Sequence, residues 1–194
     1  LLNFDQLNKG LTTELLSLTL KTISFGLITS LIAVIFSLIL SLATRKNKNF
    51  FLKLITFPAG LGYAIPGSVL AISLITISSS RFTFISVCLL IWGYVIRFLT
   101  ISKGSIDSAL ERISPTLDEA ANGLGSNWLE IIRRIHLPLL KGPIFVGSLL
   151  VFVDTIKELP ISFIYRPLDF DTLSVRIYQY AGDERLAEAI LPVL

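Results

Sequence analysis

Asp154, Lys157 and Glu158 stand close together in an otherwise apolar run that begins after Gly142. If this segment is helical, spacings of three and four residues bring the carboxylates within reach of Lys157 and of one another. Ionisable groups at membrane depth usually face a pathway or the protein interior. The three residues are therefore candidates for lining a translocation pathway. The alternative is a neutralised structural pair, with Pro160 ending the helix near the outer membrane surface.

Few other residues are arranged for chemistry. Two carboxylates are few for a hard metal ion, which prefers several oxygen ligands. His136 is the only histidine and Cys88 the only cysteine, so neither predicts a metal site, and we expect packing or solvent-facing roles. The sequence contains no phosphate-binding glycine loop followed by Lys and Ser or Thr. We therefore expect no catalytic site, no ATP hydrolysis and no cofactor bound by this chain.

The composition is that of an integral membrane protein. Hydrophobic residues make up 53% of the chain and charged residues 16%, and the mean hydropathy is +0.74. The charged residues are clumped, which leaves long windows that can enter a bilayer without burying an ionised group. The basic residues do not interleave with aromatic residues, which argues against a nucleic acid as partner.

Apolar windows predict four membrane-spanning helices and the start of a fifth. The predicted spans are residues 22–44, 54–78, 82–102, 142–164 and, incompletely, 187–194. The first is long enough to cross a ~30 Å hydrocarbon core. The second contains "FPAGLGYAIPG", whose prolines and glycines predict a bent or broken helix. Such a break is either a packing kink or a part of the pathway, with Pro66 as a candidate lining residue.

The distribution of basic residues predicts the orientation. Four of them stand between the first two spans with no acid among them: Arg45, Lys46, Lys48 and Lys53. Positive loops are retained in the cytoplasm. Alternation then places residues 103–141 inside and residues 166–185 outside.

The inside passage, residues 103–141, is patterned as two short helices joined by a glycine turn. An apolar stripe recurs at steps of three and four residues through Leu110, Ile113, Leu117, Ala121 and Leu124. Ser114 followed by Pro115 predicts a helix start. Gly123 and Gly125 predict its end, because glycine permits a left-handed backbone.

The second short helix is predicted to begin at a capping box formed by Asn127 and Glu130. One face carries Trp128, Ile131, Ile132 and Ile135, and Arg133 and Arg134 lie away from it. We expect Pro138 to end this helix before the next span. A helix pair of this kind either lies on the lipid interface or docks into a partner protein.

The stretch "EAANGLGSNWLEIIRRIHLP" (Glu119 to Pro138) resembles the EAA loop of binding-protein-dependent ABC transporter permeases. The pattern is Glu-Ala-Ala, three residues, Gly, nine residues, and Ile-x-Leu-Pro. Every fixed position is met, by Glu119, Ala120, Ala121, Gly125, Ile135, Leu137 and Pro138.

The resemblance implies a multi-span helical bundle of the type I ABC importer kind, in the bacterial inner membrane. Its cytoplasmic loop would carry a coupling helix that sits in a groove of a separate ATPase subunit, which binds ATP and magnesium. Glu119 would make a polar contact, Ala120 and Ala121 would allow close approach, and Gly125 would supply the turn. Leu124, Trp128 and Leu129 are further expected ATPase contacts. An ATP-independent carrier or a channel would have no reason to carry such a loop.

Two further phrases, "GYAIPGSVLAI" and "KELPISFIYRPLDFDTLSVRIYQYAGDERLAEAILP", resemble the second half of ferric-iron permeases. Permeases for thiamine, sulfate, molybdate and polyamines share much of this layout. The resemblance implies one permease domain over residues 1–194, incomplete at both ends. It also implies a second half-pore in the same chain or in a dimer, and an extracytoplasmic substrate-binding protein.

The outer loop contains the candidate contacts with that binding protein, namely Arg166, Asp169 and Asp171. The alternative is an ordinary solvated loop, in which Leu173, Ile177 and Tyr180 hold a short interfacial helix against the membrane.

Overall fold

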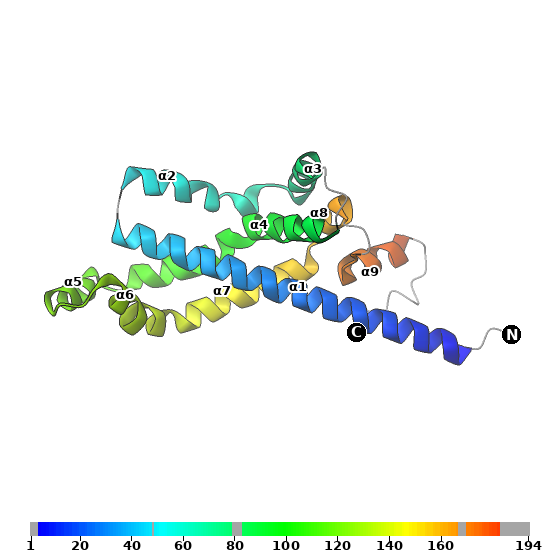
Figure 1. Cartoon of the computed structure of the whole chain (residues 1–194), viewed down its shortest axis with the longest axis horizontal. Helices are drawn as coiled ribbons and strands as arrows, with labels where there is room; N and C mark the ends of the chain where they lie inside the picture. Colours follow the sequence, from blue (N-terminus) through cyan, green and yellow to red (C-terminus); the bar gives the residue numbers. More distant parts are fainter. Residues whose placement is uncertain (1–3, 48, 79–82, 167–169, 183–194) are drawn as a thin grey trace. The chain divides into compact units, whose positions relative to one another are not determined.

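The structure is a computed structural model of the 194-residue chain, and it describes residues 4–47, 49–78, 83–166 and 170–182. Every regular element in these ranges is a helix, which confirms the predicted all-α fold. The elements in chain order are α1 (Phe4–Lys46), α2 (Phe50–Ala59), η1 (Gly62–Ala64), α3 (Gly67–Ile77), α4 (Thr83–Arg112), α5 (Pro115–Gly123), α6 (Trp128–Ile131), η2 (Ile132–His136), α7 (Leu137–Lys157), α8 (Pro160–Tyr165) and α9 (Leu173–Gly182) (Figure 1).

Three helices in the described part of the chain are long and apolar enough to cross a membrane. They are Thr13–Lys46, Phe84–Arg112 and Trp128–Lys157, and the broken pair Phe50–Ala64 with Gly67–Ile77 makes a fourth if it counts as one span. The helices at the first and third predicted windows extend beyond them, because an apolar window marks only the part suited to hydrocarbon, whereas helical backbone continues into charged residues. The predicted span at 142–164 differs: its helix begins earlier, ends at Lys157, and is followed by the separate helix α8. The predicted span at 187–194 lies outside the described residues.

The chain divides into two compact units. The first comprises the described parts of residues 1–29, 65–94 and 152–194. In it α3 lies beside α8 (Figure 1), and the ring of Phe25 on α1 meets that of Tyr94 on α4 edge-on, with centroids 5.2 Å apart. The start of α9 is fixed to α1 because the Leu173 amide donates to Thr22 Oγ1 at 3.0 Å.

The second unit comprises residues 30–64 and 95–151. In this unit α1, α4 and α7 approach one another through small residues. The hydroxyls of Ser37 and Ser102 are hydrogen-bonded, and a Cβ on Gly147 would lie 3.2 Å from the Ser102 Cα. Small residues let helix backbones come close where lipid supplies no hydrophobic driving force for association.

An apolar cluster follows these small residues toward the end of α1. Its buried members are Leu42, Ile106, Leu110, Ile113 and Leu140, and partly buried residues including Trp128 and Ile132 pack against it. The cluster brings α1, α4 and α7 together with the start of the α6–η2 segment. It therefore forms the base on which the predicted loop is built.

The predicted break in the second span is present. The α2 helix ends at Ala59, and η1 passes so close to α4 that a Cβ on Gly62 would lie 2.0 Å from the Ile96 carbonyl oxygen. The Thr100 hydroxyl on α4 donates to the Ala59 carbonyl at 2.8 Å. A neighbouring helix thus satisfies backbone that the break sets free, as irregular structure at membrane depth requires.

Candidate functional site

The passage between α4 and α7 folds as a helix–turn–helix, with α5 beside α6 (Figure 1). The start of α5 is as predicted, since the Ser114 side chain accepts from the Thr116 amide and Pro115 takes the first helical position. At its end, the Ser126 amide donates to the Ala121 carbonyl at 3.0 Å. This is the Schellman arrangement, in which a left-handed residue reverses the chain.

The left-handed residue of the turn is Gly125, at φ +85°. The predicted glycine end of the helix is therefore confirmed, and Gly125 is the residue that supplies the left-handed conformation. Gly123 is the last residue of α5, and Gly125 alone among the described glycines has a positive φ.

The predicted capping box at the start of α6 is confirmed. The Glu130 amide donates to Asn127 Oδ1 at 3.0 Å, and the Asn127 amide donates to Glu130 Oε2 at 2.9 Å. Each residue satisfies a backbone amide that the helix start leaves without a partner. The turn between α5 and α6 is therefore fixed at both ends by local hydrogen bonds.

The prediction that Pro138 ends this helix is wrong. The α6, η2 and α7 segments follow one another without interruption from Trp128 to Lys157. The η2 segment is a π-helical turn, in which the Leu137 amide donates to the Ile132 carbonyl five residues earlier. A wider turn separates the proline ring from the carbonyl that it would meet in a regular helix. The helix can then continue through the proline.

The single apolar stripe predicted from Leu110 to Leu124 is also wrong. Leu110 and Ile113 are buried in the cluster at the end of α4, whereas Leu117 and Leu124 on the next segment are exposed. The helix that holds Leu110 ends at Arg112, and a new one starts after Ser114. The helical phase restarts at this break, so the same spacing no longer describes one face.

The exposure of the seven predicted ATPase contacts divides them into two groups. Glu119, Ala120, Leu124, Gly125 and Leu129 are exposed, and Ala121 and Trp128 are half-buried. Leu124 is 88% exposed and Leu129 54%. Trp128 instead packs against residues of this chain. Its ring centroid is 5.7 Å from that of His136, and the Lys46 ammonium lies over its ring.

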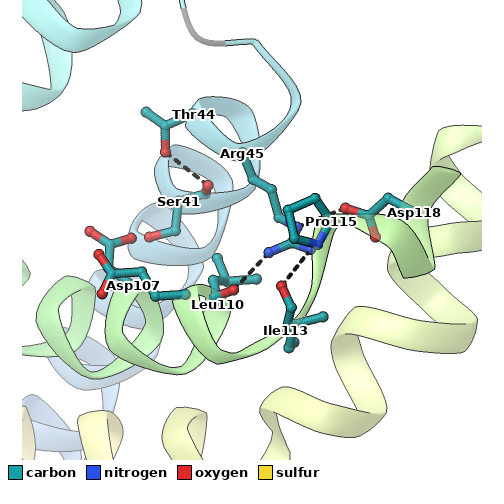
Figure 2. Close-up of a pocket in the computed structure, with 9 residues that line it drawn as sticks. Ser41, Thr44, Arg45, Asp107, Leu110, Ile113, Pro115 and Asp118 are labelled. Carbon is teal, nitrogen blue, oxygen red and sulfur yellow. Dashed lines mark hydrogen bonds and ion pairs between the residues drawn. The ribbon is translucent and has the colours of Figure 1, made fainter.

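Arg45 connects this helix–turn–helix to the membrane helices, and Figure 2 shows its guanidinium between the end of α4 and Asp118. Its Nε donates to Asp118 Oδ2 at 2.8 Å, its Nη1 to the Leu110 carbonyl at 2.7 Å and its Nη2 to the Ile113 carbonyl at 3.0 Å. The sequence pattern had indicated only that Arg45 marks the cytoplasmic side. No local spacing points to this role, because Arg45 and Asp118 are 73 residues apart.

His136 lies on the other side of Asp118. It is fully buried, and its Nε2 is 3.1 Å from Asp118 Oδ1, although the alignment falls short of a hydrogen bond. Of the two roles expected for this histidine, packing is the one observed. Asp118 thus lies between a residue of α1 and a residue of η2.

A hollow of about 570 Å³ opens beside Arg45 (Figure 2). It is lined by Ser41, Thr44, Arg45, Asp107, Leu110, Glu111, Ile113, Pro115 and Asp118. The ends of α1 and α4 and the start of α5 form its walls. The helices therefore meet here around polar side chains rather than in the apolar cluster alone.

The candidate pathway residues do not lie on one helix. Asp154 is half-buried and Lys157 exposed on α7, which ends at Lys157. Glu158 is buried in the break before α8, and its carbonyl accepts from the hydroxyls of Ser162 and Ser174 at 3.0 and 3.2 Å. The helix does end before Pro160, as the structural alternative expected. A role in a pathway stays a prediction for these residues and for Pro66, which precedes the first residue of α3.

The outer-loop candidates contact one another. Arg166 Nε and Nη2 donate to the two carboxylate oxygens of Asp171, both at 2.7 Å, and Asp169 lies outside the described residues. In the described ranges no three His, Cys, Asp or Glu residues are grouped as a metal site would require.

Membrane-length helices, joined by a capped helix–turn–helix that exposes apolar residues, define a polytopic membrane protein. Residues 33–165 match the family described as "Binding-protein-dependent transport system inner membrane component". The match covers more than half of the chain, so the protein belongs to this family. It confirms the resemblance seen in the sequence, and it agrees with an inner-membrane location and with a transport subunit rather than an enzyme.

The chain has low sequence identity to individual relatives. The chain is 26% identical over 129 residues to the Fe(3+)-transport system permease protein FbpB 2 of Haemophilus influenzae, a match that covers 66% of this chain and 26% of that protein. It is 28% identical over 96 residues to the ferric transport system permease protein FbpB of Actinobacillus pleuropneumoniae, covering 47% of this chain and 13% of that protein. The chain thus spans about a quarter or less of the length of these relatives.

Proposed function

We propose that this chain is part of the membrane-spanning permease of an ATP-driven, binding-protein-dependent importer, and that the α5–α6 turn docks into its ATPase subunit. The observation that carries the proposal is the exposed tip of this turn. Leu124, at 88% exposure, stands beside Gly125 on a turn fixed at both ends by capping. A rigid projection with exposed leucines is typical of a surface that a partner covers.

The charge of α5 favours a protein partner over the lipid surface. Helices that lie on membranes are usually rich in Lys and Arg on their polar face, which attract anionic lipids. The α5 helix contains Asp118 and Glu119 and no basic residue. We therefore propose that Glu119, Ala120, Leu124 and Leu129 contact the ATPase, and that Ala121 and Trp128 support them from within.

The substrate that we propose is ferric iron. The support is the similarity to proteins named as ferric-iron permeases, together with the phrases "GYAIPGSVLAI" and "KELPISFIY". In this proposal ATP and magnesium bind to the ATPase, and a second permease half completes the pore. A soluble binding protein delivers the substrate to the side that carries Arg166 and Asp171. Pro66, Asp154, Lys157 and Glu158 are the proposed pathway residues.

The test uses the full-length protein reconstituted in proteoliposomes with its ATPase and binding protein. ATP is enclosed on the ATPase side, and uptake of labelled ferric citrate is compared with uptake of thiamine, sulfate, molybdate and a polyamine. We expect ATP-dependent uptake of iron alone. ATP-dependent uptake of another solute would contradict ferric iron as the substrate but would still support the proposal of an importer. Uptake without ATP, or no association with an ATPase, would refute the importer itself.

A further inference from the structure

We propose that Arg45 is a positioning residue that transmits displacement of the α5–α6 turn to the ends of α1 and α4. This inference rests on the proposed function, because it assumes that a partner moves the turn. The basis is a single side chain of α1 that contacts both α4 and α5. Arg45 belongs to the last turn of α1. It donates hydrogen bonds to the carbonyls of Leu110 and Ile113 at and just after the end of α4, and it forms an ion pair with Asp118 of α5.

The contacts of Arg45 lie at the end of α4 and in the break that follows it. A helix leaves its last carbonyls without intrahelical partners, and a cation there also opposes the negative end of the helix dipole. Arg45 donates to the carbonyls of Leu110 and Ile113 and more weakly to that of Ser114, at 3.4 Å. The break between α4 and α5 is thus bound to α1.

The ion pair is better shielded than a surface pair. The side chains of Arg45 and Asp118 are 13% and 16% exposed, so solvent screens their attraction less than it screens an exposed pair. On its other side Asp118 faces the buried His136 at 3.1 Å. Moving Asp118 therefore disturbs contacts with α1 and with the helix that continues into α7.

The next residue reinforces the same connection. Lys46 lies over the Trp128 ring at 5.7 Å from the centroid, and Trp128 packs against the apolar cluster at the base of the loop. Two consecutive residues of α1 therefore contact α5 and α6, one through an ion pair and the other through a cation–π contact.

Replacement of Arg45 by lysine separates two roles of this residue: its positive charge, which helps to orient the protein in the membrane, and its directed hydrogen bonds. A lysine at position 45 would preserve the positive charge that retains the loop in the cytoplasm. Its single ammonium group cannot reproduce the planar fork that reaches Asp118 and two carbonyls in fixed directions. Arg45→Lys thus removes the positioning contacts and leaves the charge.

The experiment compares Arg45→Lys, Asp118→Asn and the double variant in the reconstituted full-length transporter. Arg112→Lys is the matched control, since Arg112 is exposed at the end of α4. Membrane abundance, ATPase co-purification, ATP hydrolysis and ferric citrate uptake are measured. We expect the Arg45 and Asp118 variants to keep wild-type abundance and co-purification. Uptake per ATP hydrolysed should fall at least about fivefold, the low end of typical coupling between sites. The double variant should be no worse than the more impaired single variant.

A distance measurement tests the connection independently of the substrate. Spin labels on cysteines at the exposed positions Asn47 and Asn122, with Cys88→Ser, should give one narrow distance distribution in the wild type. Arg45→Lys should broaden it, and Arg112→Lys should not.

The outcomes separate the two proposals. If the wild type binds no ATPase, the proposed function fails, while the labels still test the connection. Wild-type coupling and an unchanged distance distribution in Arg45→Lys would overturn the inference. Loss of abundance in both single variants, with coupling per folded molecule unchanged, would also overturn it and leave Arg45 a structural role.

Discussion

Gly123 and Gly125 lie two residues apart where α5 ends, but they differ in what the backbone demands of them. Gly125 has φ +85°, a conformation that places a Cβ too close to the following carbonyl. Gly123 is helical, and a Cβ there would meet nothing within 4 Å. Glu119 lies one helical turn before Gly123, and it is exposed and outside the apolar cluster. A substitution of Glu119 can therefore affect a partner contact without affecting folding.

Gly125→Val should disrupt the turn. A β-branched residue in the left-handed region costs roughly 1–2 kcal/mol or more, so the α5–α6 turn should change shape and ATPase co-purification should fall. Gly123→Val is the matched control, because it changes a helical glycine with open space around it. Equal co-purification of the two variants would show that the left-handed turn is not needed for docking.

Glu119→Lys should weaken ATPase association while leaving the protein folded. The residue is exposed and belongs to no contact of the cluster beneath it. Reversal of an interface charge can turn attraction into repulsion worth several kcal/mol. Membrane abundance, ATPase co-purification and uptake are measured. The control is Arg112→Glu, which reverses the charge of an exposed residue at the end of α4. Normal binding and uptake by Glu119→Lys would leave the turn as an interfacial helix pair only.

At the scale of elements, helix ends and breaks decide how the site is presented. The break at Ser114 separates α4 from α5 and allows the Arg45 guanidinium to reach the carbonyls of Leu110 and Ile113. The π-helical turn carries the chain past Pro138 and joins the loop to α7 as one continuous helix. A displacement of α6 therefore has a direct helical route into the next span.

The break between α2 and α3 is a second interruption of helical structure that positions neighbouring elements. Gly62→Ala should destabilise the protein strongly, because its Cβ would lie 2.0 Å from the Ile96 carbonyl oxygen, and backbone cannot move aside as a flexible side chain can. Gly60→Ala is the control, since its nearest contact would be 3.3 Å and its φ is −81°. Thermal stability in detergent and membrane abundance are the measurements. Equal stability of the two variants would show that η1 does not approach α4 this closely.

For the whole molecule, the membrane orientation determines which loops face the proposed ATPase and which face the proposed binding protein. Arg45 and Lys46 contact Asp118 and Trp128. The loop after α1 and the passage between α4 and α7 are therefore neighbours, which agrees with the prediction that both face the same side. Their basic residues predict that this side is the cytoplasm.

Labelling from either side of the membrane tests this orientation. Cysteines at the exposed positions Asn47 and Asn122 should react only with reagents on the cytoplasmic side. A cysteine at Ala181, which is exposed on α9, should react only from outside. Cys88→Ser removes the native thiol in each case. Reaction of Asn47→Cys from the outside would reverse the orientation derived from the basic loop.

Features that depend on near neighbours could be predicted from the order of residues alone. The all-helical membrane class follows from long windows without charge, and the family from a motif of fixed spacing. The start of α5 at Ser114 and the capping box of Asn127 and Glu130 were predictable because the bonds join residues within three positions. Local chemistry of this kind leaves its evidence in consecutive residues.

How these elements are joined depends on contacts between residues far apart in the chain. The Arg45–Asp118 pair spans 73 residues, and no periodic pattern encodes which distant helix end a cation will reach. The apolar spacing from Leu110 to Leu124 was misleading because a helix break between them changed the direction of the side chains. Pro138 misled for a related reason, since a wider turn accommodated a ring that a regular helix would reject. These outcomes depend on the packing of several helices at once, which the order of residues in one segment does not contain.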